Sequence, residues 1–239
     1  MIDFHTHILP EIDDGSNSVK ESVVLIKQLK QQGVNNIVLT PHFYAYSSSA
    51  ENFNEIKSKS LKTLLEELKT ENIEIRLYSG CEVFFFEELW RIDNLKDLCI
   101  KGTDFMLLEM PFTKWTGSMV RSIERLIGKG ITPIIAHFER YTKHKENLAK
   151  IYELVEMGAI LQMNCAYINK FSTRRKAISF IRKGMVSLLG SDCHNIADRA
   201  PEYSKAIEYL KKKLSREDYR RFVGFQKKIL SGAHKVYPI

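Results

Sequence analysis

Histidine and carboxylate side chains recur in this 239-residue chain where short apolar runs end. Five of the seven histidines lie at such ends, together with two glutamates and one aspartate: His5, His7, His42, Glu82, Glu109, His137, Asp192 and His194. Imidazole and carboxylate groups without a thiolate cluster are typical ligands of hydrolytic Zn²⁺, Mn²⁺ or iron sites. So many candidate ligands exceed the needs of one ion. They suit two or three ions with a bridging carboxylate, as in multi-metal phosphoester hydrolases.

These residues follow apolar segments that alternate with segments of helical period. We predict seven strands, over Ile2–Phe4, Asn36–Thr40, Ile75–Ser79, Asp104–Leu108, Thr132–Ala136, Ala159–Met163 and Val186–Leu189. We predict helices over Ser18–Gln32, Asn52–Thr70, Ser118–Lys129, Lys143–Glu156, Thr173–Arg182, Pro201–Lys213 and Ser215–Leu230. Four glycines, Gly33, Gly130, Gly158 and Gly184, are placed to end helices as C-terminal caps.

This alternation indicates an α/β fold with parallel strands, for which a closed or distorted β/α barrel and an open doubly wound sheet are the two candidates. A doubly wound sheet that binds a dinucleotide has a glycine-rich loop after its first strand. Here the first strand runs into His5-Thr6-His7, which favours the barrel. In a barrel the strand ends meet at one face, so the candidate ligands would share a rim. No linker composition divides residues 1–239, and we expect a single domain.

Composition is ordinary for a soluble protein, with 44% hydrophobic and 27% charged residues. There is no run of 18 apolar residues and no secretory signal at Met1, so we expect a cytoplasmic protein without membrane insertion. The net charge of +7 suits an anionic partner without identifying one. Much of the excess lies in Lys211-Lys212-Lys213, Arg220-Arg221 and Lys227-Lys228, which we interpret as a solvated helix face rather than a docking patch.

The chain resembles the polymerase and histidinol phosphatase (PHP) superfamily, and within it the manganese-dependent bacterial protein-tyrosine phosphatases of capsule and exopolysaccharide operons, the CpsB/YwqE group. The resemblance spans almost the whole chain. It rests on Asp3-Phe4-His5-Thr6-His7-Ile8-Leu9-Pro10, Ile12-Asp13-Asp14-Gly15, Thr40-Pro41-His42, Gly80-Cys81-Glu82, Leu108-Glu109-Met110-Pro111, Ala136-His137-Phe138-Glu139-Arg140-Tyr141, Ser191-Asp192-Cys193-His194-Asn195 and Arg199-Ala200-Pro201. The fold that it implies is a distorted (β/α)7 TIM-like barrel, the PHP fold.

The resemblance also implies three metal ions per chain, most readily Mn²⁺, with iron or zinc as alternatives. The first ion would bind His5, His7, Glu82 and Asp192. Glu82 would bridge to the second ion, which adds Glu109 and His137. The third would bind Asp14, His42 and His194. The neighbouring Asp13 would instead cap the helix that starts near Ser18. Glu11 departs from the glycine that relatives often carry, and its charge would slightly weaken phosphate binding.

The implied activity is that of a phosphoric monoester hydrolase, in which a metal-bound hydroxide attacks phosphotyrosine. Arg140 and Arg199 would bind the phosphoryl oxygens, although each could instead pair with a carboxylate of the metal site. Five aromatic residues could flank the tyrosine ring or simply pack in loops: Phe43, Tyr44, Tyr46, Phe112 and Trp115. The implied substrate is the phosphorylated tyrosine-rich tail of a bacterial tyrosine kinase that regulates polysaccharide production.

Other functions are compatible with parts of the pattern. Cys193 and Arg199 satisfy the C-x5-R signature of cysteine-dependent phosphatases, but the segment lacks a glycine and we interpret the match as coincidental. The four cysteines form no C-x-x-C pair and are expected to be free thiols. A histidinol-phosphatase-like enzyme acting on small molecules and a PHP exonuclease acting on nucleic acid remain alternatives. A kinase-binding scaffold without activity would be favoured only if ligands were missing, and none is.

Overall fold

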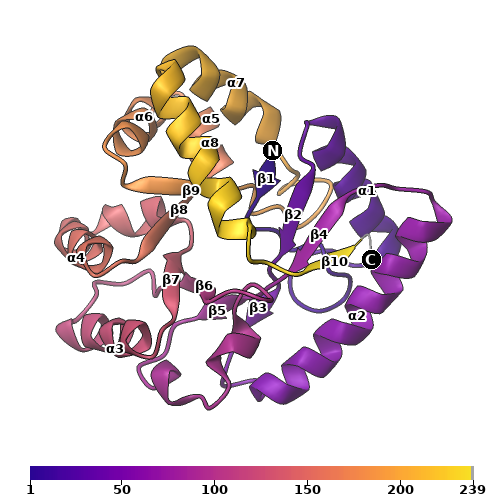
Figure 1. The fold of residues 1–239 in the computed structure, drawn as a ribbon, viewed down its shortest axis with the longest axis horizontal. Coiled ribbons are helices and arrows are strands. Elements are labelled where there is room, and N and C mark those ends of the chain that lie inside the picture. The colour runs from indigo at the N-terminus through magenta and orange to yellow at the C-terminus, as the bar shows by residue number, and fades with distance from the viewer. Residues whose placement is uncertain (238–239) are drawn as a thin grey trace.

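The strands form two short sheets that together surround one interior (Figure 1). The structure is a computed structural model that describes residues 1–237. The first sheet has the order β1-β2-β4-β10 and the second β3-β5-β6-β7-β8-β9. The strand bounds are β1 Ile2–Asp3, β2 Asn36–Leu39, β3 His42–Phe43, β4 Arg76–Ser79, β5 Glu82–Phe84, β6 Phe105–Glu109, β7 Thr132–Ile135, β8 Ile160–Asn164, β9 Val186–Gly190 and β10 Lys235–Tyr237.

Two predicted strands continue beyond an interruption, which is why the structure has more strands than the sequence pattern indicates. The second continues past Thr40-Pro41 as β3, and the third continues past Gly80-Cys81 as β5. Backbone hydrogen bonds cross both interruptions: Gly80 N donates to Leu39 O (2.9 Å), and Glu82 N donates to Pro41 O (3.0 Å). The paired strands are parallel, apart from β10, which runs antiparallel to β4.

The barrel closes between its first and last parallel strands. Phe4 N donates to Leu189 O (3.0 Å), and Asp192 N donates to His5 O (2.9 Å). Thr6 and Cys193 form a parallel bridge just beyond β1 and β9. This closure confirms the predicted barrel and shows that the open doubly wound alternative was wrong. The barrel is distorted because β4 pairs with β10 at Leu77 and Tyr78, whereas its continuation β5 pairs with β6.

Each predicted helix is present, with ends shifted by at most a few residues. The α-helices are α1 Val19–Gln31, α2 Ala50–Thr70, α3 Gly117–Gly128, α4 Lys145–Glu156, α5 Cys165–Asn169, α6 Arg174–Arg182, α7 Tyr203–Lys213 and α8 Arg216–Leu230. The short 3₁₀-helices are η1 Leu89–Arg91, η2 Leu95–Leu98 and η3 Phe138–Lys143. The four predicted cap glycines have φ between 71° and 105°, a region that favours glycine. The short elements β10, α5 and the 3₁₀-helices were not predicted.

Two apolar clusters separate the inside of the barrel from its outer layer. The interior holds side chains from alternate strand positions, including Phe4, Val38, Leu107, Ile134 and Leu188. The intervening strand residues face outward and pack under the helices, which surround the strands (Figure 1). Ile229 and Leu230 at the end of α8 belong to the interior cluster. Within residues 1–237, no helix combines the length and apolar character needed to cross a bilayer.

Candidate metal centre

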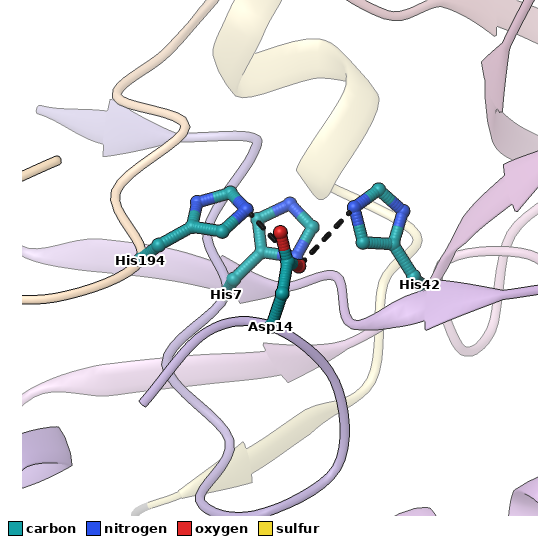
Figure 2. Close-up of side chains that lie close together, drawn as sticks. All are labelled: His7, Asp14, His42 and His194. Atoms are coloured by element: carbon teal, nitrogen blue, oxygen red, sulfur yellow. Dashed lines mark ion pairs between the residues drawn. The ribbon is translucent and has the colours of Figure 1, made fainter. Parts of the chain in front are cut away.

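The structure brings all nine predicted ligand residues to the carboxyl-terminal end of the barrel. Eight of them come from strand ends: His5 and His7 after β1, His42 in β3, Glu82 in β5, Glu109 in β6, His137 after β7, and Asp192 and His194 after β9. The ninth, Asp14, lies in the loop between β1 and α1. The side chains of Asp14, His42 and His194 converge around that of His7 (Figure 2).

The Glu82 carboxylate lies at the middle of this cluster and is 1% exposed. Its Oε2 is 2.9 Å from His5 Nε2 and 3.2 Å from both His7 Nε2 and His42 Nδ1. Its Oε1 is 3.0 Å from His137 Nε2. Burial alone would raise the pKa of Glu82, but the surrounding histidines outweigh burial and hold it well below its usual value. A carboxylate that faces histidines through both oxygens has the geometry of a bridging ligand.

Three overlapping groups of side chains have donor atoms close enough to hold a cation. The groups are His7, Asp14, His42 and His194; His5, His7 and Asp192; and His42, Glu82 and Glu109. Most of the predicted division recurs, with three differences. Glu82 is absent from the group that contains His5 and Asp192. His7 joins the group of Asp14, and His42 takes the place beside Glu109 that we assigned to His137. His137 is nevertheless close, with Nε2 3.5 Å from Glu109 Oε1.

The hydrogen bonds of three histidines point their Nε2 atoms into the cluster. The Nδ1 atom lies 3.2 Å from Gln162 Oε1 in His5, 2.7 Å from Asp13 Oδ2 in His7, and 3.0 Å from the Asp192 carbonyl oxygen in His194. Each partner is an acceptor, so in the neutral ring the proton is on Nδ1 and Nε2 keeps its lone pair. This is the tautomer that a metal-ligating histidine requires.

Four histidine nitrogens in the cluster either crowd against one another or make no hydrogen bond, which fits a cation site. The Nε2 atoms of His5 and His7 lie 3.0 Å apart, and both face the same Glu82 oxygen. Two buried nitrogens, His42 Nδ1 and His194 Nε2, make no hydrogen bond within the described chain. Buried polar atoms normally have a partner. A divalent cation would bind the lone pairs of these nitrogens and so supply one. The residues therefore fit a metal centre.

Protonation of His7 and His137 is favoured when no cation offsets the carboxylates. Burial lowers the pKa of His7, but hydrogen bonds to Asp13 and Glu82 outweigh it and raise the pKa to about 10. Hydrogen bonds to Glu109 and Glu82 likewise overcome burial at His137 and raise its pKa to about 9. His194 behaves oppositely: burial and the neighbouring His7 lower its pKa to about 3. A bound metal would have to displace the protons held by the first two rings.

The structure assigns Asp13 a different place from the one predicted. The side chain that caps α1 is Ser18, which accepts a hydrogen bond from Glu21 N. Asp13 instead accepts from His7 Nδ1 (2.7 Å) and from His42 N (2.9 Å). Its pKa falls to about 2 because the hydrogen bond to His7 outweighs burial. The helix-cap prediction was wrong because the loop turns Asp13 back toward β1, where it accepts a hydrogen bond from the His7 ring instead of capping α1.

Strand β8 contributes two amides that the sequence pattern did not single out. Gln162 Oε1 accepts from His137 N (2.7 Å) as well as from His5 Nδ1 (3.2 Å). Gln162 Nε2 donates to Asn164 Oδ1 (3.0 Å), and Asn164 Nδ2 donates to Asp192 Oδ2 (2.7 Å). This chain of amide hydrogen bonds links candidate ligands from three strands. The available signal was two polar residues spaced for one face in an otherwise apolar strand.

Arg140 and Arg199 both contact Asp192, the ion pairing that was the alternative to a phosphate-binding role. Arg140 Nη2 is 3.2 Å from Asp192 Oδ2, and Arg199 Nη2 is 2.9 Å from Asp192 Oδ1. The two side chains are 40% and 37% exposed, so part of each guanidinium faces solvent. Both line a cavity of about 300 Å³ that also contacts Asp192. The arginines thus have donors left for a ligand beside the cluster.

The five aromatic candidates divide into two classes. Phe43 and Trp115 are buried to 1% exposure and belong to the apolar core, so neither can flank a substrate ring. Tyr44 stacks on His42 with ring centroids 5.1 Å apart, and Phe112 stacks on His137 at 5.8 Å. Tyr46, 82% exposed, packs against Tyr44. Tyr44 and Phe112 therefore border the candidate metal ligands, and Tyr46 reaches them only through Tyr44.

Cys193 lacks the properties of a phosphatase nucleophile. Its side chain is buried between the closing strands, and burial raises its pKa far above the usual value for a thiol. A catalytic thiolate needs the opposite, a lowered pKa and an accessible sulfur. The other cysteines, Cys81, Cys99 and Cys165, are also buried, and all four are free thiols as predicted.

Comparisons with known proteins agree with this geometry. The model of the capsular polysaccharide synthesis family CpsB/CapC matches residues 1–230. The tyrosine-protein phosphatase CpsB of Streptococcus agalactiae serotype III is 27% identical over 227 residues, covering 91% of this chain and 92% of its own. The tyrosine-protein phosphatase YwqE of Bacillus subtilis is 29% identical over 223 residues, covering 91% and 86%.

A solved structure shares the fold over nearly the whole chain. It comes from work on YwqE of Bacillus subtilis and CpsB of Streptococcus pneumoniae, described as unique metal-dependent tyrosine phosphatases. Its TM-score is 0.83 at 26% identity, covering 98% of this chain and 96% of the other. The predicted resemblance to the CpsB/YwqE group is therefore confirmed.

Proposed function

Because the chain belongs to the CpsB/CapC family of capsular polysaccharide synthesis, we propose that it is a metal-dependent protein-tyrosine phosphatase, a phosphoric monoester hydrolase. The observation that carries this proposal is the set of histidines around the Glu82 carboxylate, with two arginines beside it. No predicted ligand position lacks a ligating side chain. The site therefore has both a place for divalent cations and donors for a phosphate group.

The proposed cofactor is Mn²⁺, with three ions per chain held by the nine ligand residues. When bound, such ions lower the pKa of water to about 7 and offset the charge of the phosphoryl oxygens. The ligand set does not by itself select the metal, because imidazole and carboxylate also accept iron and zinc. Buried Glu82 is the proposed bridge, since both of its oxygens face histidine nitrogens.

The chain's own residues supply orientation and charge. Asp13 and Gln162 hold His7 and His5 in the tautomer that leaves Nε2 free. The unpaired N–H groups of Arg140 and Arg199 bind the phosphoryl oxygens and stabilise the charge that develops on them. Tyr44 and Phe112 border the tyrosine ring. The phenolate that leaves has a pKa near 10, so strong general-acid assistance is unnecessary.

The proposed physiological substrate is the phosphorylated tyrosine-rich tail of a bacterial tyrosine kinase that regulates capsular or exopolysaccharide synthesis. Family membership supports this choice. Histidinol phosphate and single-stranded DNA serve as competing substrates, because related folds act on small phosphomonoesters and on nucleic acid.

The decisive experiment measures hydrolysis of a phosphotyrosine peptide after chelation and again after Mn²⁺ is restored. We expect activity to disappear and return, and Glu82→Gln to abolish it while exposed Glu124→Gln leaves it unchanged. Activity that survives chelation would reject the metal mechanism. Faster hydrolysis of histidinol phosphate or DNA than of the peptide would reject the proposed substrate class while retaining the metal centre.

A further inference from the structure

We propose that a cavity between α2, β4 and the chain's last strand binds a small organic phosphate. The cavity has a volume of about 750 Å³. Its walls come from α2, the end of β4, η2, the loop of residues 101–104 and the segment that leads into β10. None of its lining residues is a candidate metal ligand. A ligand there would therefore occupy a second site, separate from the proposed phosphatase centre.

The observation that carries this inference is Lys57, a buried cation that lines the cavity and has almost no protein partner. Its side chain is 7% exposed. The one hydrogen bond that its Nζ makes within the described residues is a long one, 3.4 Å, to the Gly80 carbonyl oxygen. The face of the Phe53 ring lies 5.2 Å from Nζ, a cation–π contact that offsets part of the cost of burial but occupies none of the N–H donors with an acceptor atom. Among residues 1–237, no carboxylate lies within 4.0 Å of this ammonium group.

An ammonium group has three N–H donors, and burying it unpaired is unfavourable. Burial accordingly lowers the pKa of Lys57. A methionine or leucine at this helix position would fill the same space without that penalty. The lysine is therefore better explained by an anion that enters the cavity than by its contact with Gly80.

The remaining charges of the cavity also favour an anion. Lys96 is paired with Asp104 at 2.8 Å. Lys101 has no carboxylate within 4.0 Å in the described chain, so two lysines face the cavity without an ion pair. Asp97 is the one lining carboxylate that is left to oppose them. Because two lysines exceed one carboxylate, a phosphate dianion complements the cavity better than a cation or a neutral ligand.

Backbone contacts hold the cavity wall in place. Lys101 N donates to Ser79 O (2.8 Å), and His234 N donates to Lys101 O (2.8 Å). At Gly102, which has a φ of 84°, an added Cβ would lie 2.6 Å from the His234 ring. That ring thus packs directly on the glycine and fixes the loop that carries Lys101. The wall is formed before any ligand binds, which reduces the ordering required on binding.

The volume selects a phosphorylated small molecule over inorganic phosphate. Small-molecule sites usually measure about 300–1,000 Å³, and a bare phosphate ion would leave most of this cavity unfilled. Ser58, Ser79 and Thr103 line the same space, and the hydroxyls of Ser58 and Thr103, which donate to the carbonyl oxygens of Asn54 and Ile100, can still accept a hydrogen bond from a ligand. Hydroxyl groups complement the polar body of a sugar phosphate or nucleotide, so we place the phosphate at Lys57 and the polar body against these residues.

The test compares wild type with Lys57→Met and with Lys59→Met, which removes an exposed lysine from the same helix. Calorimetry on the Mn²⁺-loaded protein would use the methylenephosphonate analogue of glucose 1-phosphate, which cannot be hydrolysed, and inorganic phosphate. We expect wild type and Lys59→Met to bind one more equivalent of the analogue than Lys57→Met. Any analogue that binds at the metal centre does so in all three proteins, so it does not affect the difference in stoichiometry between them. Equal stoichiometry in all three would overturn the proposal.

Thermal unfolding separates a ligand site from a structural role of Lys57. If the role of Lys57 is to bind an anion, then in the absence of ligand Lys57→Met should unfold at the same temperature as wild type or at a higher one. The analogue should then raise the unfolding temperature of wild type and of Lys59→Met by more than that of Lys57→Met. A lower unfolding temperature would instead mean that the contact with Gly80 matters. In that case exposed Lys101→Met provides the remaining test: an analogue affinity unchanged from wild type would overturn the proposal. If inorganic phosphate binds as tightly as the analogue, the cavity does not prefer an organic phosphate, and that part of the proposal is wrong.

Discussion

The guanidinium Nη2 of Arg199 lies 2.9 Å from Oδ1 of Asp192, the carboxylate oxygen that is also 3.6 Å from the Nε2 atoms of His5 and His7. A side chain from the loop after β9 thus touches the same oxygen that faces two metal-ligand candidates. A phosphate bound by Arg199 would therefore lie directly beside the metal centre. The same contact also gives Arg199 a second possible role, which is to hold Asp192 in place.

Replacing Arg199 distinguishes these two roles. We expect Arg199→Ala to lower kcat/KM for a phosphotyrosine peptide by about 10²–10³-fold, the usual effect of removing one donor to a developing negative charge. Arg199→Lys should recover only part of the loss, because lysine lacks the planar fork. Manganese content, measured on the same samples, should remain at the wild-type value. A loss of metal that accounts for the loss of rate would show that Arg199 only positions Asp192. Arg221→Ala, which breaks an exposed ion pair with Asp218, is the control.

The amide chain on β8 predicts an effect on metal affinity. Gln162→Met keeps the side-chain volume but removes the acceptor for His5 Nδ1 and the donor to Asn164. Because partners of this kind orient ligands, Mn²⁺ affinity should fall about 10–100-fold. Gln226→Met provides the matched control, since Gln226 is also buried but lies in α8. Equal Mn²⁺ affinities of the two variants, measured by titration after chelation, would argue against a positioning role.

Cys193 should be dispensable for the reaction. Its thiol is buried and its pKa is raised, so the attacking thiolate required by the C-x5-R mechanism is not available. We expect Cys193→Ser to retain activity within a few-fold of wild type, whereas Asp192→Ala and His194→Ala should abolish it. The measurement is the steady-state rate at which each variant hydrolyses the phosphotyrosine peptide. An inactive Cys193→Ser variant that is folded and loaded with manganese would restore the cysteine mechanism.

Protons and metal ions should compete for His7. The pKa of His7 is about 10 in the metal-free fold against 6.5 in an unfolded chain. The folded state therefore binds this proton more tightly, which stabilises it fully below pH 6.5 and less as the pH approaches 10. The metal-free protein should lose stability over that interval, as measured by urea unfolding at a series of pH values. The apparent Mn²⁺ affinity should rise over the same interval, because each ion displaces protons.

Asp13→Asn tests the cause of this pH dependence. The substitution removes the charge that holds the proton on His7 Nδ1, so the folded pKa of His7 should move back toward its ordinary value. Both pH profiles should become flatter between pH 6.5 and 10. Profiles identical to those of wild type would mean that another group controls the titration.

Local patterns were sufficient to predict the barrel and the placement of the candidate ligands at one rim. The strands are short apolar runs, and the residue after each run faces one rim whatever the details of packing, so His42 or His137 could be placed without coordinates. The role of Gln162 could not be predicted in this way. A neutral amide gives no chemical signal of its own, and its function follows from the register of β8 against β7 and β9. Asp13 was misassigned because a carboxylate before a helix usually caps it, and the competing contact comes from the preceding strand.

Barrel closure has a consequence for how the chain folds. The bridge between Thr6 and Cys193, just beyond β1 and β9, joins residues that are far apart in the sequence, and β10 meets β4 across a similarly long separation. Contacts of such high contact order form slowly, since a long loop must close before they contribute. His5 and His7 meet Asp192 and His194 only at that step. Metal binding should therefore occur with the slowest phase of refolding. The rate of manganese binding during refolding would then report the rate at which the barrel closes.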